Sequence, residues 1–115
     1  MASAHSIVNC STILHQILRE YCEILNRNQH QPTSQLIVSE DHTRYLIIRA
    51  GWIEEQRIHS LLFDGEIRDN KIWLHHDGLN HGIVEDLLAA GIDKESIVLA
   101  FHPPDIREHT GYAIA

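Results

Sequence analysis

A chain of 115 residues, 43% hydrophobic and 22% charged, has the size and composition of one soluble globular domain spanning residues 1–115. It contains no apolar run near the ~20 residues that a membrane span needs, and its N-terminus lacks a secretory signal pattern, so we expect a cytoplasmic protein. Nine basic against sixteen acidic residues give a formal net charge of −7. Because proteins that bind phosphate backbones carry basic faces, this charge argues against direct DNA binding by the chain alone.

The first predicted element is an amphipathic helix from about Ser6 to Asn28, ended by polar residues and Pro32. Its apolar stripe recurs at helical spacings and comprises Ile7, Leu14, Leu18, Tyr21 and Leu25, widened by Ile13, Ile17 and Ile24. Cys10 and Cys22 fall within this helix about 18 Å apart, too far for a disulfide. We therefore expect both cysteines to be reduced and partly buried.

Two pairs of β-strands are predicted next, from runs rich in β-branched and aromatic residues. The first pair covers 34–40 and 44–52, joined by a tight turn, and the second covers 57–68 and 71–76. Asp69-Asn70 suits a two-residue hairpin loop, because both residues tolerate positive φ.

The second hairpin has a predicted register that starts from Arg68 opposite Lys71. It places Ile67 opposite Ile72, Gly65 opposite Leu74 and Phe63 opposite His76. One face then carries the apolar side chains Leu61, Phe63, Ile67, Ile72 and Leu74. The other face carries the polar group and one tryptophan: Asp64, Glu66, Arg68, Lys71, Trp73 and His75.

A second helix is predicted at about 80–90, with Asn80 as N-cap and Gly91 as C′ residue, followed by Ile92 packing back on the helix. Residues 96–101 form a short buried strand, and Pro103-Pro104 begin a C-terminal helical turn. With no linker or repeat, these elements predict one α+β domain with helices against one face of a largely antiparallel sheet.

The stretch "LAFHPPDIREHT" holds the residue types of a metal or acid–base site: His102, Asp105, Glu108 and His109. A metal would need a third ligand from elsewhere, and no HExxH, HxH or CxxC spacing supplies one. We therefore favour a structural role for this stretch, with a small metal-dependent enzyme using His102, Asp105 and His109 as the alternative.

The remaining histidine-rich stretch, "HHDGLNHG", favours a structural interpretation too. His75 and His76 alternate across a strand, so they cannot share a metal without a bulge, and His75 should lie opposite Asp64. His81 belongs to the start of the second helix. No phosphate-binding loop or nucleophile elbow is present, and we assign no catalytic, cofactor or metal residues.

An exposed aromatic within a charged rim is typical of an interaction surface. Trp73 falls on the polar face of the predicted hairpin, among Glu66, Arg68 and Lys71. This group, or the adjoining His102–Arg107 end, is the predicted contact surface for a partner. The alternative is a tryptophan lying flat among the stems of charged neighbours.

The chain resembles the XisI-like family, the fdxN element excision controlling factors of filamentous nitrogen-fixing cyanobacteria. The resemblance covers nearly the whole chain and rests chiefly on "KIWLHHDG" and "GIVEDLLAAGIDKESIVLAFHPPDIREHTGYAIA". "GLNHG" departs from a GTExG-like family segment, so an acid is missing near Asn80.

The resemblance implies a non-enzymatic accessory factor for programmed DNA excision, in which a separate site-specific recombinase performs the strand chemistry. It also implies a XisH-like, nuclease-fold partner, and it supplies no catalytic residues to carry over. A second interpretation is an antitoxin-like inhibitor whose acidic surface would occupy the basic groove of such a partner. Homo-oligomer formation stays open.

Overall fold

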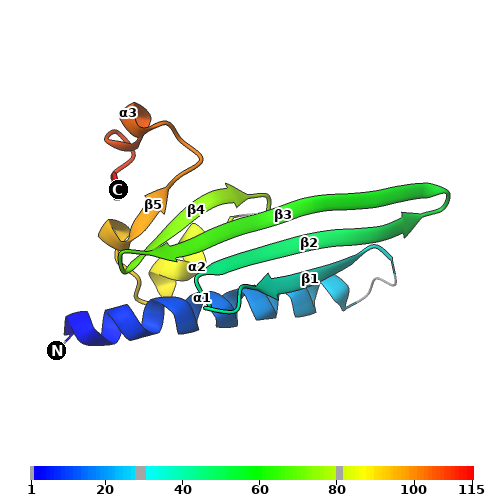
Figure 1. The fold of residues 1–115 in the computed structure, drawn as a ribbon, viewed down its shortest axis with the longest axis horizontal. Coiled ribbons are helices and arrows are strands. Elements are labelled where there is room, and N and C mark those ends of the chain that lie inside the picture. Colours follow the sequence, from blue (N-terminus) through cyan, green and yellow to red (C-terminus); the bar gives the residue numbers. More distant parts are fainter. Residues whose placement is uncertain (1, 28–30, 80–81) are drawn as a thin grey trace.

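The computed structural model describes residues 2–27, 31–79 and 82–115, with side chains from residue 10 onward. A long helix, α1 (Ala2–Asn26), precedes a five-stranded sheet in the order β1-β2-β3-β4-β5 (Figure 1). The strands are β1 (Thr33–Val38), β2 (Arg44–Ile53), β3 (Gln56–Arg68), β4 (Lys71–Asp77) and β5 (Ile97–Leu99). Between β4 and β5 the chain forms α2 (Val84–Ala89) and the short 3₁₀ helix η1 (Lys94–Ser96), and after β5 it forms α3 (Pro104–Arg107).

Strand pairing confirms the predicted largely antiparallel α+β fold. β1 to β4 pair antiparallel in sequence order, and β5 joins β4 in parallel after the crossover through α2. β5 is buried along its whole length, as its continuous apolar run predicts.

α1 buries the stripe expected from its four-residue spacing, with Leu14 and Leu18 fully buried. Cys10 and Cys22 are free and buried on the same side. Ile24 was expected to widen this stripe but is 60% exposed, so the buried face is narrower than predicted. Ile7 and Asn28 lie outside the described side chains and residues.

The end of α1 is fastened to β1 by the Asn26 side chain. Its Nδ2 donates to the Ser34 carbonyl at 2.9 Å, and its Oδ1 accepts the Ser34 N–H at 2.8 Å. This pair satisfies backbone groups of the first strand that have no ladder partner on that side.

The predicted register of the β3–β4 hairpin is confirmed near its turn and wrong beyond it. Asp69 and Asn70 both have positive φ, and the pairs from Arg68↔Lys71 to Gly65↔Leu74 are those expected. A β-bulge then shifts the ladder, so that Phe63 lies opposite Asp77 instead of His76. The extra residue on β4 resets the alternation, as bulges do.

A second bulge corrects the predicted position of Leu61. The ladder passes from Ile47↔Phe63 to Ile48↔Leu61 and leaves Leu62 without a partner in the register. Leu62 therefore packs against the core, whereas Leu61 turns to the other face and is 40% exposed. Simple two-residue alternation could not anticipate this because the bulge inserts one residue into β3.

α2 is shorter than predicted. The segment that leads into it is held by hydrogen bonds to Asp77, the last residue of β4. Asp77 accepts the N–H of Ile83 at 2.8 Å through Oδ2 and the N–H of Leu79 at 3.2 Å through Oδ1. The proposed N-cap, Asn80, lies outside the described residues. The helix end follows the prediction, since Gly91 has φ 98° and the Ile92 N–H bonds to the Leu87 carbonyl.

The sheet has two unlike faces, called here inner and outer. The inner face packs against α1 and α2 and forms the main core, which includes Tyr45, Ile47, Phe63, Ile72 and Leu74. Among the described residues of the outer face, the large buried side chains are Trp73 and Val98 at the β4–β5 end, apart from that core.

The molecule is longer than a compact domain of its size. Its radius of gyration is 15.1 Å and its extents are 50 × 31 × 26 Å, whereas a compact chain of this length would have a radius near ~13 Å. The β2–β3 hairpin, which runs well past β4 and β5 as an arm, contributes to this length (Figure 1).

Candidate functional site

Two of the predicted contact residues, Glu66 and Arg68 on β3, belong to a charged cluster on the outer face. Glu66 stands at its centre, with its Oε1 2.8 Å from Arg68 Nη2, 2.8 Å from His75 Nε2 and 4.0 Å from Arg44 Nη1. Arg44 also binds both carboxylate oxygens of Asp64, at 2.8 and 2.9 Å. The cluster is thus an ion-pair network that crosses β2, β3 and β4.

The network fixes the charge of its own members. Hydrogen bonds from Arg68 and then from His75 hold the pKa of Glu66 below its usual range. The hydrogen bond to Asp64 raises the pKa of Arg44. The carboxylates of Asp64 and Glu66 therefore each have a guanidinium group within hydrogen-bonding distance.

Trp73 lies on the outer face as predicted, but it is not the exposed aromatic expected there, since only 8% of it is accessible. Its Nε1–H donates to the Arg68 carbonyl at 3.2 Å. The guanidinium carbons of Arg68 and Arg107 lie 4.2 and 5.8 Å from the ring centroid. Stacked arginines and the C-terminal segment cover the ring, so the alternative of a tryptophan flat among charged stems describes the site better.

Arg107 holds the C-terminal segment in place. Its Nε donates to the His102 carbonyl at 2.9 Å, and its two terminal nitrogens donate to the carbonyls of Ala100 at 3.3 Å and Ile114 at 3.4 Å. Lys71 donates to the backbone oxygen of Ala115, reinforcing the same contact. Arg107 and Lys71 therefore have a structural role, because both hold the C-terminal segment in place.

The histidines of the C-terminal stretch do not converge on a common point. The rings of His102 and Phe101 are tilted against each other with their centroids 4.7 Å apart, while the exposed His109 lies 3.6 Å from Glu108. Asp105 is exposed in the first turn of α3. Among the residues that the structure describes, no group of three or more His, Cys, Asp or Glu could hold a metal ion.

His75 and His76 are also separated in their contacts. His75 was expected opposite Asp64, but the bulge puts His76 there, and His75 bonds Glu66 instead. His81 lies outside the described residues. The "HHDGLNHG" stretch thus contributes one member to the ion-pair network.

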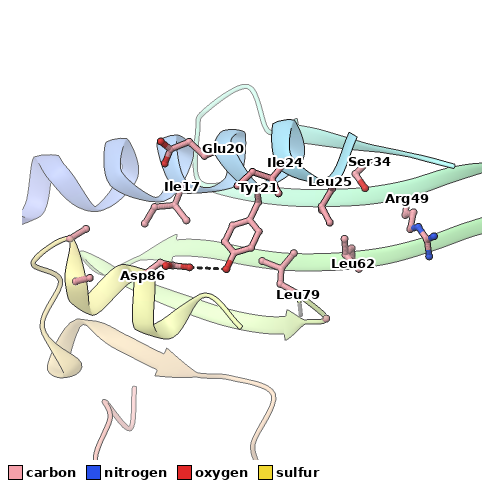
Figure 2. Close-up of a pocket in the computed structure, with 13 residues that line it drawn as sticks. Ile17, Glu20, Tyr21, Ile24, Leu25, Ser34, Arg49, Leu62, Leu79 and Asp86 are labelled. Carbon is pink, nitrogen blue, oxygen red and sulfur yellow. Dashed lines mark hydrogen bonds between the residues drawn. The ribbon is translucent and has the colours of Figure 1, made fainter. Parts of the chain in front are cut away.

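A groove of about 800 Å³ opens on the other side of the sheet, between α1, α2 and the inner face (Figure 2). Tyr21 points from α1 to α2, where its hydroxyl donates to Asp86 Oδ2 at 2.7 Å and lies 3.2 Å from the Gly82 carbonyl. Burial and the bond to Asp86 raise the pKa of Tyr21. The walls are otherwise mostly apolar and include Ile17, Ile24, Leu25, Leu62 and Leu79.

Sequence reasoning missed this groove. Tyr21 is visible in the sequence only as a member of the apolar stripe of α1, and its partner Asp86 lies 65 residues further on. Arg49 and Glu20, which also line the groove, come from different elements and form no motif. Such a site arises from tertiary packing, for which spacing gives no signal.

Membrane insertion through a helix finds no support in the fold. None of the described helices is both long and apolar enough to span a bilayer.

The fold defines a small α+β domain in which a long N-terminal helix lies on a five-stranded sheet and a projecting hairpin forms one end (Figure 1). The model of the XisI protein family matches residues 5–114, and the chain belongs to this family.

Two crystal structures from Anabaena variabilis ATCC 29413 show the same architecture. The fdxN element excision controlling factor XisI is 30% identical, with a TM-score of 0.80 over 96% of this chain and 99% of that one. A XisI-like protein is 27% identical, with a TM-score of 0.85 over 95% of this chain and 99% of that one. No curated protein matches the chain significantly.

Proposed function

We propose that this protein is a non-enzymatic accessory factor that controls the excision of a DNA element. The observation that carries the proposal is the similarity, over 96% of the chain, to a protein described as the fdxN element excision controlling factor XisI. The chain would regulate a reaction whose strand cleavage and joining are performed by a separate site-specific recombinase.

The proposed mode of action is protein contact, with a XisH-like protein and the recombinase complex as partners. A net charge of −7 disfavours tight binding of this chain alone to the DNA backbone. The polar groups at the β4–β5 end are engaged in the fold, since Glu66 pairs with Arg68 and Arg107 binds backbone carbonyls. Exposed apolar side chains remain elsewhere for a partner to bury.

The proposal is tested in cells that carry an excisable element. We expect deletion of the gene to reduce excision, measured by PCR across the rejoined junction, and complementation to restore it. A His102→Ala/His109→Ala variant separates regulation from chemistry, because a regulator that needs no metal should complement fully. Unchanged excision in the deletion strain would refute the proposal, and failure of the histidine variant despite normal folding would favour the metal-dependent alternative.

The partner is tested by co-expressing the protein with a XisH-like protein. We expect the two chains to co-elute in size-exclusion chromatography as a complex larger than either alone. Separate elution at micromolar concentrations would remove the XisH-like protein as the partner.

A further inference from the structure

The outer face of β1, β2 and β3 carries a row of apolar side chains outside the core. On β2, Tyr45 and Ile47 are buried on the inner face, so the residues that alternate with them along the strand point outward. The register places Ile37 beside Leu46 and Leu61 beside Ile48. We call the following set the outer strip: Ile37, Leu46, Ile48, Ala50, Trp52 and Leu61.

None of the other segments that the structure describes covers the outer strip. α1 and α2 pack on the inner face, and the C-terminal segment covers the sheet only near Trp73. Trp52, at the far end of the arm, is 51% exposed, and Ile37 and Leu61 are also exposed. A contiguous apolar row on an otherwise polar surface marks an interaction site more often than scattered single residues do.

Charge is distributed unevenly between this face and the rest of the molecule. By register, the outward strand positions hold four of the nine basic residues, Arg44, Arg57, Arg68 and Lys71, but only two of the sixteen acidic ones, Asp64 and Glu66. These strand positions therefore carry a small excess of basic residues in a chain whose formal charge is −7.

Arg57 is the cation of this face that is left for a partner. Arg44 and Arg68 are neutralised by Asp64 and Glu66, and Lys71 binds the C-terminal segment. Arg57 lies 5.6 Å from the Trp52 ring and, within the described part of the chain, makes no ion pair. An aromatic beside an available arginine has the composition of an interface hot spot.

These charges decide between occupants of the surface. A second copy meeting face to face would offer Arg57 no acidic partner from this face, because Asp64 and Glu66 are already paired with Arg44 and Arg68. A DNA duplex would need several free cations, whereas most of these are already bound. A protein with an apolar patch and acidic side chains fits both the outer strip and Arg57.

We propose that the outer strip, together with Arg57, is the docking surface for a partner protein that presents an apolar patch flanked by acidic side chains. The inference rests on the proposed function and names the surface through which that regulator acts. It replaces Trp73 by Trp52 as the exposed aromatic of the contact.

The test uses the full-length chain with the co-expressed XisH-like protein as probe. A Trp52→Ala/Leu61→Ala variant should keep the wild-type circular dichroism spectrum and bind at least about thirtyfold more weakly, the effect of losing a hot-spot contact. The matched control is Ile24→Ala/Ile106→Ala, which removes two exposed apolar side chains outside the strip and should bind normally.

A charge variant gives a second readout. Arg57→Glu should slow association and reduce its dependence on salt, whereas Arg19→Glu, an exposed arginine on α1, should do neither. Normal binding by the strip variant, or equal weakening by its control, would overturn the inference and leave the proposed function standing. A wild-type complex that never forms would remove the XisH-like partner and this inference together, and self-association through the strip would overturn the choice of occupant.

Discussion

Trp73 shows how one residue can lie on the expected face and still have a different role. Sequence alternation predicts that Trp73 and Leu74 point to opposite faces of the sheet, and the structure confirms this. Alternation gives no information about Arg68 and Arg107, whose guanidinium groups lie over the ring. Trp73 is therefore part of a small second core that joins β4 to the C-terminal segment.

We predict that Trp73→Ala lowers the free energy of unfolding by roughly 3 kcal/mol, because it empties a buried site and removes the surface on which two guanidinium groups rest. Leu74→Ala, in the main core, should cost about 2–5 kcal/mol. Urea denaturation of both variants checks this, with Trp52→Ala as the exposed control. A Trp73→Ala protein as stable as wild type would show that the ring is not part of a core.

Glu66 gives an expectation for acidic pH. Its pKa is lowered in the folded protein by Arg68 and His75, so its contribution to stability is present above the unfolded pKa, near ~4.3, and is lost as pH falls through the folded value. We expect Glu66→Gln to lose less stability than wild type between about pH 5 and pH 2. Urea titrations across that range measure the two slopes, and parallel curves would contradict the assignment.

At the scale of elements, the sequence predicts the parts that depend on local pattern. The order of elements, the Asp69-Asn70 turn and the Gly91 helix end all follow from periodicity and turn chemistry. The two bulges do not, because each inserts one residue that two-residue alternation does not signal. They account for the wrong positions of Leu61 and His75.

The contact between α1 and α2 depends on Tyr21. Removing its hydroxyl in Tyr21→Phe leaves the apolar ring in the groove but breaks the bond to Asp86. We expect a loss of about 1 kcal/mol at neutral pH, the usual net value of such a hydrogen bond. Thermal unfolding followed by circular dichroism tests this, and Tyr112→Phe, near the C-terminal segment, is the matched control.

The same residue predicts behaviour at alkaline pH. The folded pKa of Tyr21 is raised, so its stabilising effect is complete below the unfolded pKa, near ~10, and declines as pH rises above that value. Wild type should therefore lose stability above about pH 10 more steeply than Tyr21→Phe. Equal slopes for the two proteins between about pH 9 and pH 11 would show that Tyr21 ionises as freely as in the unfolded chain.

At the scale of the whole molecule, the main core and the proposed docking surface occupy different parts of the sheet. The core is built around α1, α2 and the proximal parts of β2, β3 and β4, where Tyr45, Phe63 and Leu74 are fully buried. The distal arm carries Trp52, Ile53 and Arg57 in exposed positions and contributes little to that core. In the proposed complex, a partner protein covers this arm.

Shortening the arm should therefore separate folding from binding. Residues 52–57 can be replaced by Asn-Gly, which forms a two-residue turn between the paired residues Gly51 and Ile58. We expect the shortened protein to unfold at nearly the wild-type urea midpoint, because no fully buried residue is removed, and to lose the complex with the XisH-like protein. A control that replaces only Glu54-Glu55 with Asn-Gly keeps Trp52 and Arg57 and should bind. If the shortened protein still forms the complex, recognition lies nearer the core, and the groove beside Tyr21 becomes the surface to examine.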